Sequence, residues 1–192
     1  MKKIVLGAIL SLSVACSGAN SQETQKPKQV ANAALVKLPP PPPCSEKEFR
    51  QLDFWLGDWD LEWTGSKGKV GHGRNTITKT PYKNCVISEN FDGAPSLQFK
   101  GMSISTYDKA RKIWRQTWVD DQGGYYALNG GPNKDGTFTL TMARPDNKGP
   151  HRRMIWSEIK KDSLVWSWQG HKDGEDEWQD LWVIHYKRRA PK

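Results

Sequence analysis

The clearest pattern in this chain is an alternation that places tryptophan at every second position of several segments. Alternate residues of an extended strand share one face, so this period of two predicts β-strands with rings gathered on one side of a sheet. The pattern leaves open whether the rings fill a core or wall a cavity. The alternating positions are Trp114, Gln116 and Trp118 in one segment, Leu164, Trp166 and Trp168 in a second, and Trp178, Asp180 and Trp182 in a third.

Strands of this kind recur along most of the chain, separated by short clusters of Gly, Asn, Asp and Pro that are typical of turns. The regular spacing and short connections predict an all-β fold with a single antiparallel meander. Closure into a barrel of about ten strands would remove the exposed edges, and ten strands leave more interior room than eight. The predicted strands are 58–64, 70–79, 84–91, 99–107, 111–120, 123–129, 136–143, 151–159, 163–170 and 177–187.

One short helix is predicted ahead of the strands. Ser45 and Glu48 have the spacing of a capping box, with Ser45 at the N-cap and the glutamate three residues later. The apolar residues that follow favour a helix over about residues 46–54, and Gly57 ends it.

The first residues predict export. Lys2 and Lys3 precede an uncharged apolar run that ends at Ala15, which is the pattern of a signal peptide over residues 1–15 and is too short to span a bilayer. Leu12-Ser13-Val14-Ala15-Cys16 resembles the lipobox of bacterial lipoproteins, although Ser13 stands where leucine is usual. The resemblance implies lipidation of Cys16 and a permanent membrane anchor. The alternative is an ordinary secretory signal followed by a chance cysteine.

The segment after Cys16 predicts a tether. Residues 16–43 lack aromatic residues and end in five prolines, Pro39 to Pro43, which favour a stiff polyproline spacer. Ser17, next to the cysteine, favours the outer membrane by the same lipoprotein resemblance, which places the protein on the periplasmic side of the cell envelope. The folded domain is predicted over residues 44–187, followed by a basic tail, 188–192.

The formal net charge of +8 lies on the ends of the chain rather than on the predicted barrel. Nine of the 29 Lys and Arg residues and one of the 21 acidic residues lie outside 44–186, which leaves twenty of each sign inside. We therefore expect no nucleic-acid partner. In an exported protein, anionic lipid is a better partner than nucleic acid for the basic ends of the chain.

Two cysteines remain after Cys16. Cys44 and Cys85 form an even pair in a small domain that is predicted to be exported, which suggests a disulfide between the start of the domain and its third strand. Two separate buried thiols are the alternative. A metal site is not indicated, because no histidine lies at ligand spacing from either cysteine.

Several motifs resemble a bacterial domain family of unknown function with a lipocalin-like (calycin) barrel. The signature is Phe54-Trp55-Leu56-Gly57-Asp58-Trp59, and matches continue through Trp114-Arg115-Gln116-Thr117-Trp118 to Trp182-Val183-Ile184-His185-Tyr186. The resemblance implies a ten-stranded barrel closed at one end by the short helix, with no assigned reaction. Nitrobindin, a haem-binding barrel, is a more distant resemblance that makes His185 a candidate haem ligand. Because His185 alternates with Trp182, Ile184 and Tyr186, we expect it to face solvent instead.

The favoured function is binding of a small apolar or amphipathic molecule in an aromatic cavity. The sequence lacks the motifs of enzymes that use a nucleophilic serine or bind phosphate through a glycine-rich loop, and no resident cofactor is predicted. Two alternative functions stay open, namely a haem-binding barrel and a structural module of the envelope without a ligand. Four polar residues are predicted to point inward, namely Glu89, Gln116, Glu158 and Asp180, with Glu89 either orienting a ligand or pairing with Arg115 or a tyrosine hydroxyl. The predicted ligand-binding residues are Trp59, Glu89, Trp114, Gln116, Trp118, Tyr126, Trp156, Trp166, Trp168 and Trp182.

Overall fold

A computed structural model describes residues 39–79, 82, 84–144, 149–171 and 177–190 of the chain. The described elements all belong to one compact unit, Pro40–Lys192. The predicted signal peptide and Cys16 lie outside the described residues. Within the part that is described, no helix is both long and apolar enough to cross a bilayer.

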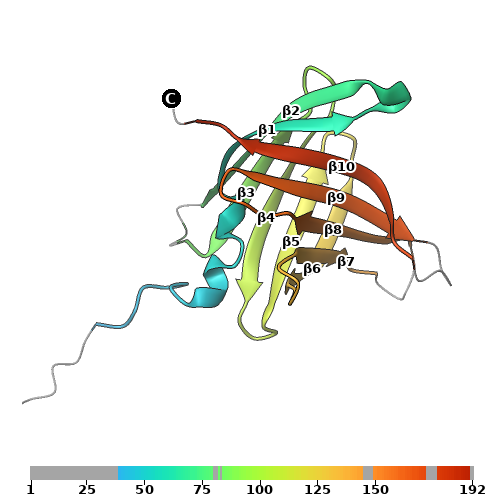
Figure 1. Cartoon of the computed structure of the whole chain (residues 1–192). Coiled ribbons are helices and arrows are strands. Elements are labelled where there is room, and N and C mark those ends of the chain that lie inside the picture. The colour runs from blue at the N-terminus through green and yellow to red at the C-terminus, as the bar shows by residue number, and fades with distance from the viewer. Residues whose placement is uncertain (1–38, 80–81, 83, 145–148, 172–176, 191–192) are drawn as a thin grey trace, which may run out of the picture. The chain divides into compact units, whose positions relative to one another are not determined.

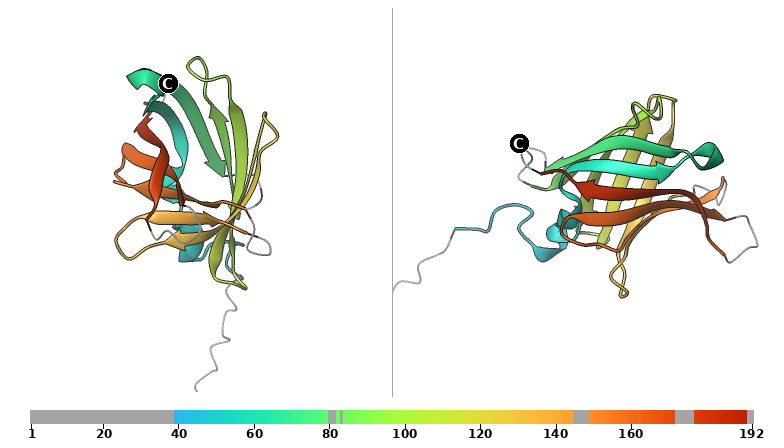
Figure 2. Two further views of the ribbon diagram at one scale, coloured as in Figure 1. Left: turned by 90° about the vertical axis from the view of Figure 1, so that its right-hand side faces the viewer. Right: turned by 45° about the horizontal axis from the view of Figure 1, so that its top comes forward.

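The unit is a closed barrel of ten antiparallel strands, as the alternation predicted (Figures 1 and 2). Each strand pairs with its neighbours in the sequence, and β1 pairs with β10 to close the sheet, with Trp59 opposite Arg188. The strands are β1 Gly57–Thr64, β2 Val70–Lys79, β3 Val86–Asp92, β4 Lys100–Asp108, β5 Ile113–Asp120, β6 Tyr125–Pro132, β7 Phe138–Met142, β8 His151–Ser157, β9 Ser163–His171 and β10 Gln179–Arg188. Strand β10 thus includes Arg188, which the sequence had placed in a basic tail.

The predicted helix is present as two short 3-10 helices, η1 (Lys47–Arg50) and η2 (Asp53–Trp55). A third, η3 (Ser66–Gly68), lies in the β1–β2 connection. The buried residues Phe49, Leu52 and Trp55 are three positions apart, and a 3-10 helix places such residues on one face. This face packs on one end of the barrel, so the prediction of a short segment that closes one end is confirmed.

The predicted capping box is wrong. The N-cap of η1 is Glu46 rather than Ser45, and no side chain caps the helix by a hydrogen bond. Glu46 instead forms an ion pair with Lys109, in the β4–β5 connection. A capping side chain accepts hydrogen bonds from the free backbone N–H groups at the start of a helix. A 3-10 helix of four residues has few such groups, so it has less need of a cap than an α-helix.

Two of the four polar residues predicted to point inward lie outside the barrel. A bulge between Asp180 and Trp182 breaks the period of two in β10, so Asp180 lies opposite Gln169 on the outer face and accepts a hydrogen bond from it (2.8 Å). Trp178 lies on the same outer side, 4.2 Å from the Arg153 guanidinium. Glu158 follows the end of β8, where a φ of +48° turns the chain and leaves the side chain exposed.

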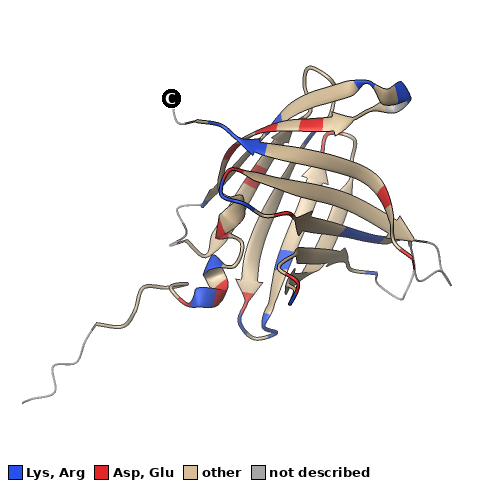
Figure 3. Cartoon of the chain, in the orientation of Figure 1, with Lys and Arg blue, Asp and Glu red and all other residues tan. Residues whose placement is uncertain are grey.

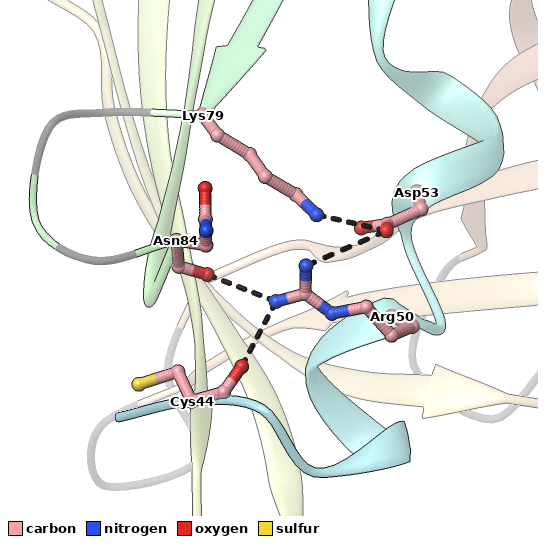
Figure 4. Close-up of polar contacts among 5 residues, drawn as sticks. All are labelled: Cys44, Arg50, Asp53, Lys79 and Asn84. Carbon is pink, nitrogen blue, oxygen red and sulfur yellow. Dashed lines mark hydrogen bonds and ion pairs between the residues drawn. The ribbon is translucent and has the colours of Figure 1, made fainter. Parts of the chain in front are cut away.

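The start of the unit is attached to the β2–β3 connection by covalent and polar contacts. The disulfide between Cys44 and Cys85 is confirmed, with a sequence separation of 41 residues. Arg50 donates to the carbonyls of Cys44 (3.0 Å) and Asn84 (3.1 Å), so it joins the same two segments (Figure 4). Asp53 accepts a hydrogen bond from Lys79 Nζ (2.8 Å), which attaches η2 to the end of β2.

Charged residues are spread over the described barrel, with both signs on the strands and in the connections (Figure 3). This distribution agrees with the balanced charge of residues 44–186.

Candidate functional site

The interior of the barrel has two halves of different character. At the end that η1 and η2 cover, large side chains pack against one another, and each is less than 2% exposed. Their rings meet edge to face, as Trp55 and Trp156 do with 5.1 Å between ring centroids. The fully buried aromatic residues of this half are Trp55, Trp59, Trp114, Phe138 and Trp156.

The other half contains a cavity of about 390 Å³. This volume falls in the range of small-molecule sites, about 300–1,000 Å³. Tyr126, Trp166, Trp168 and Trp182 are partly exposed on its wall, in contrast to the rings of the filled half. The lining residues are Glu89, Phe91, Phe99, Trp118, Asp120, Gln122, Gly124, Tyr126, Met154, Trp166, Trp168, Trp182, Ile184 and Tyr186.

Strand β4 presents small residues to the interior, and the Trp118 ring of the cavity wall packs against one of them. Three successive inward-facing residues of β4 are Gly101, Ser103 and Ser105. A Cβ atom on Gly101 would overlap the indole ring of Trp118, so the ring lies directly against the backbone of β4. A larger side chain on this face of β4 would displace Trp118 toward the cavity.

Glu89 is the buried carboxylate of the cavity and the centre of a polar network. Its side chain is 5% exposed. One carboxylate oxygen accepts from Asn75 Nδ2 (2.7 Å) and the other from Ser103 Oγ (2.6 Å). Asn75 also donates to the Tyr186 hydroxyl oxygen (3.1 Å). Strands β2, β3, β4 and β10 therefore each contribute one residue to the network.

The network has an unusual electrostatic state. Burial raises the pKa of the Glu89 carboxyl to about 7, against the opposing effect of the hydrogen bonds from Ser103 and Asn75. Burial, and after it the nearby charge of Glu89, raise the pKa of the Tyr186 hydroxyl. Near neutral pH, Glu89 can therefore be either charged or neutral, whereas Tyr186 stays neutral.

A second carboxylate, Asp120, belongs to the β5–β6 end of the cavity lining. It accepts from the Trp118 indole (3.0 Å) and from the backbone N–H groups of Gln122 (3.0 Å) and Gly124 (2.7 Å). Burial acts to raise the pKa of Asp120, but these three hydrogen bonds outweigh it, and the pKa lies below its ordinary value. Asp120 thus fixes the Trp118 ring and remains charged.

The ten predicted ligand-binding residues divide between the two halves. Glu89, Trp118, Tyr126, Trp166, Trp168 and Trp182 line the cavity. The remaining four lie in the filled half or beside it. Trp59 donates to the Trp55 carbonyl (2.8 Å), Trp114 to Gln51 (3.0 Å) and Gln116 to Ser105 (3.0 Å), while Trp156 packs against Trp55 and Phe138.

Sequence reasoning missed the partners of Glu89. The sequence suggests Arg115 or a tyrosine hydroxyl as the partner. In the structure Arg115 pairs with Asp108 (3.6 Å), and the direct partners of Glu89 are Asn75 and Ser103. Tyr186 takes part through Asn75. Asn75 and Ser103 do lie opposite Phe91 and Glu89 in the barrel register, a relationship that needs the strand pairing. Phe91 and Phe99 also line the cavity but were not predicted. They are aromatic residues like the predicted tryptophans, so the same criterion could have identified them.

His185 is exposed on the outer face of β10. It lies opposite Val165 of β9, whereas the cavity-lining residues Ile184 and Tyr186 alternate with it on the inner face. The expectation that His185 faces solvent is confirmed. Its imidazole therefore cannot reach a haem group inside the cavity. The described residues contain no group of three His, Cys, Asp or Glu side chains arranged to hold a metal ion.

No protein-family model matches this chain, and no curated protein matches it significantly. The lipoprotein and lipocalin-like resemblances of the sequence therefore stay predictions.

Proposed function

We propose that this protein is an exported lipoprotein whose barrel binds a small apolar or amphipathic molecule. The observation that carries the binding proposal is the division of the interior into a filled half and a cavity of about 390 Å³. Stability alone would favour filling the second half as well, because an empty apolar space loses packing contacts. Rigid rings with one buried carboxylate supply the shape and the polar contact that a ligand site needs.

The proposed location rests on the sequence. The charged N-terminus, the apolar run and the lipobox-like junction at Cys16 support export and lipid attachment, with the outer membrane as the destination. A disulfide between Cys44 and Cys85 suits an oxidising compartment. The lipocalin-like family remains the proposed relationship.

A cavity-filling substitution tests the binding proposal. Met154 lies on the cavity wall, and Ile155, next to it on β8, lies on the outer face. We expect Met154→Trp to abolish binding of a panel of lipids and small amphipathic metabolites, measured by tryptophan fluorescence and native mass spectrometry. Ile155→Phe should leave binding unchanged. Equal binding by both variants would place the ligand outside the cavity and refute the proposal.

Lipid attachment has a separate test. Cells that express the full chain and are supplied with a clickable fatty acid should label the wild-type protein and not Cys16→Ser. The labelled protein should also sediment with the outer membrane. Labelling that persists in Cys16→Ser, or a wild-type protein without label, would refute the anchor and leave the binding proposal standing.

A further inference from the structure

The chemistry of the cavity lining indicates a class of ligand. This inference rests on the proposed function, because it assumes that the cavity binds a small molecule. Two of the lining residues, Glu89 and Asp120, are carboxylates. None of the described residues that line the cavity is Lys, Arg or His. Such a lining opposes an anionic ligand and attracts a cation.

Aromatic rings form most of the remaining wall. Phe91 follows Glu89 by two positions on the inner face of β3, and its ring centroid lies 5.8 Å from those of Phe99 and Trp182 and 6.3 Å from that of Trp118. Trp182 in turn lies 6.0 Å from Trp166. The faces of Trp and Phe rings attract organic cations, and desolvation strengthens that attraction.

Glu89 has hydrogen-bonding capacity left for a ligand. An ionised carboxylate offers about four lone-pair positions, and Asn75 and Ser103 occupy two of them, one on each oxygen. The carboxylate belongs to the cavity lining and has no basic partner among the described residues. A ligand N–H group would fill an open acceptor position, and its positive charge would offset the cost of burying the carboxylate.

One basic residue, Arg152, lies on the inner side of β8 near the cavity strands. Arg152 alternates with Met154 and Trp156, but its guanidinium donates to the His151 carbonyl (2.8 Å) and lies against Gly170. It is not among the residues that line the cavity. An anionic ligand would therefore have to meet both carboxylates of the lining without a basic partner there.

We propose that the cavity binds a small amphipathic ammonium compound. Its ammonium group lies against Glu89 and the neighbouring Phe91 ring, and its apolar part packs on the rings of Trp118 and Trp182.

Three probes of equal chain length test this selectivity, namely n-octylamine, n-octanol and n-octanoate. Each is titrated into the wild-type protein at about pH 7.5 and followed by calorimetry and tryptophan fluorescence. We expect the ammonium probe to bind about tenfold or more tightly than the other two, because it gains both the ion pair and the cation–π contact. Comparable binding of all three would overturn the inference while supporting an apolar binding site. Binding of none would overturn both the inference and the proposed function.

Substitutions then assign the preference to Glu89. Glu89→Gln keeps the shape of the side chain and should reduce the preference for the ammonium probe to about threefold or less. The matched control is Asp60→Asn on the outside of β1, where the side chain is 61% exposed, and it should keep the full preference. A preference that survives Glu89→Gln, or tighter binding of octanoate, would overturn the assignment.

A measurement on the wild-type protein covers the case in which Glu89→Gln does not fold. Near pH 6.5, binding of the ammonium probe should release a proton, seen as a heat of binding that changes with the ionisation enthalpy of the buffer. Octanol should release none. A buffer-independent heat for the ammonium probe would overturn the proposed contact with Glu89.

Discussion

The guanidinium of Arg188 lies over the ring of Trp59, with its central carbon 4.0 Å from the ring centroid. The two residues are opposite each other in the β1–β10 pairing that closes the barrel. From this position Arg188 donates to the carbonyls of Phe54 (3.1 Å), Leu56 (2.5 Å) and Lys161 (2.8 Å). One side chain thus joins the strand closure, η2 and the β8–β9 connection.

This contact gives a physical reason for the glycine in Phe54-Trp55-Leu56-Gly57-Asp58-Trp59. Gly57 has a φ of +125°, and a Cβ atom there would overlap the Arg188 guanidinium. The two tryptophans of the motif also meet, since Trp59 donates to the Trp55 carbonyl. The motif therefore seals the filled end of the barrel, away from the cavity.

Replacing Arg188 should destabilise the protein substantially. Arg188→Met removes the cation–π contact and leaves three backbone carbonyls without their donor, so we expect a loss of about 2–4 kcal/mol in the free energy of unfolding. Arg188→Lys should recover only part of this, because an ammonium cannot reproduce the planar fork of the guanidinium. Urea unfolding of the two variants measures both values.

Arg111→Met is the control for this prediction. Arg111 is 66% exposed and pairs with Asp108 on the surface (3.1 Å), so its replacement should cost less than about 1 kcal/mol. Equal losses for the two positions would show that Arg188 acts as an ordinary surface residue.

The barrel was predictable from the sequence because its signals are local. Alternation and turn residues placed all ten strands to within three residues of the observed bounds. The same alternation correctly put Glu89 and Gln116 inside. Alternation failed at Asp180. The bulge before Trp182 puts Asp180 on the outer face and Trp182 on the inner face, and the extra residue of a bulge leaves no mark in the sequence pattern.

The division into a filled half and a cavity could not be predicted in this way. It depends on which residues face each other across the barrel, such as Gly101 against the Trp118 ring. The Glu89 network likewise joins Asn75 to Tyr186, which are 111 positions apart. Pairing over such distances follows from the register of the closed sheet, which alternation within one strand does not encode.

Gly101 should be intolerant of even a small side chain. Gly101→Ala forces the Trp118 ring away from β4, and we expect a loss of about 1–3 kcal/mol in stability together with weaker binding of amphipathic probes. Gly131→Ala on β6 is the matched control, because its new Cβ atom would lie 3.9 Å from the nearest atom, Trp114 Cδ1. That variant should remain within about 0.5 kcal/mol of wild type. Indistinguishable unfolding curves for the two variants would contradict the tight packing of Trp118.

Glu89 should make stability depend on pH. Its pKa is about 7 in the folded protein and 4.5 when unperturbed, so the folded state holds an extra proton between these values. Stability from this group is therefore greatest at low pH and falls as pH rises from about 4.5 to 7, by about 3 kcal/mol in total. Tyr186, the titratable neighbour in the network, has a raised pKa and stays neutral over this range.

The measurement compares urea unfolding of wild type and Glu89→Gln at about pH 5 and pH 8. We expect the wild type to lose about 2–3 kcal/mol more than the variant between these values, since glutamine does not titrate. Asp60→Asn, on the outer surface, should follow the wild-type pH profile. Parallel profiles for wild type and Glu89→Gln would show that the buried carboxyl does not titrate in this interval.

The disulfide should contribute stability mainly through the unfolded chain. Closing a loop with a sequence separation of 41 residues restricts the unfolded state by about 4 kcal/mol in the chain-entropy treatment. We expect Cys44→Ala/Cys85→Ala, and reduced wild type, to lose about this amount in urea unfolding. The folded barrel should keep its cavity, because Arg50 still donates to the backbone of both residue 44 and Asn84. A double variant within about 1 kcal/mol of oxidised wild type would mean that these polar contacts alone hold the two segments together.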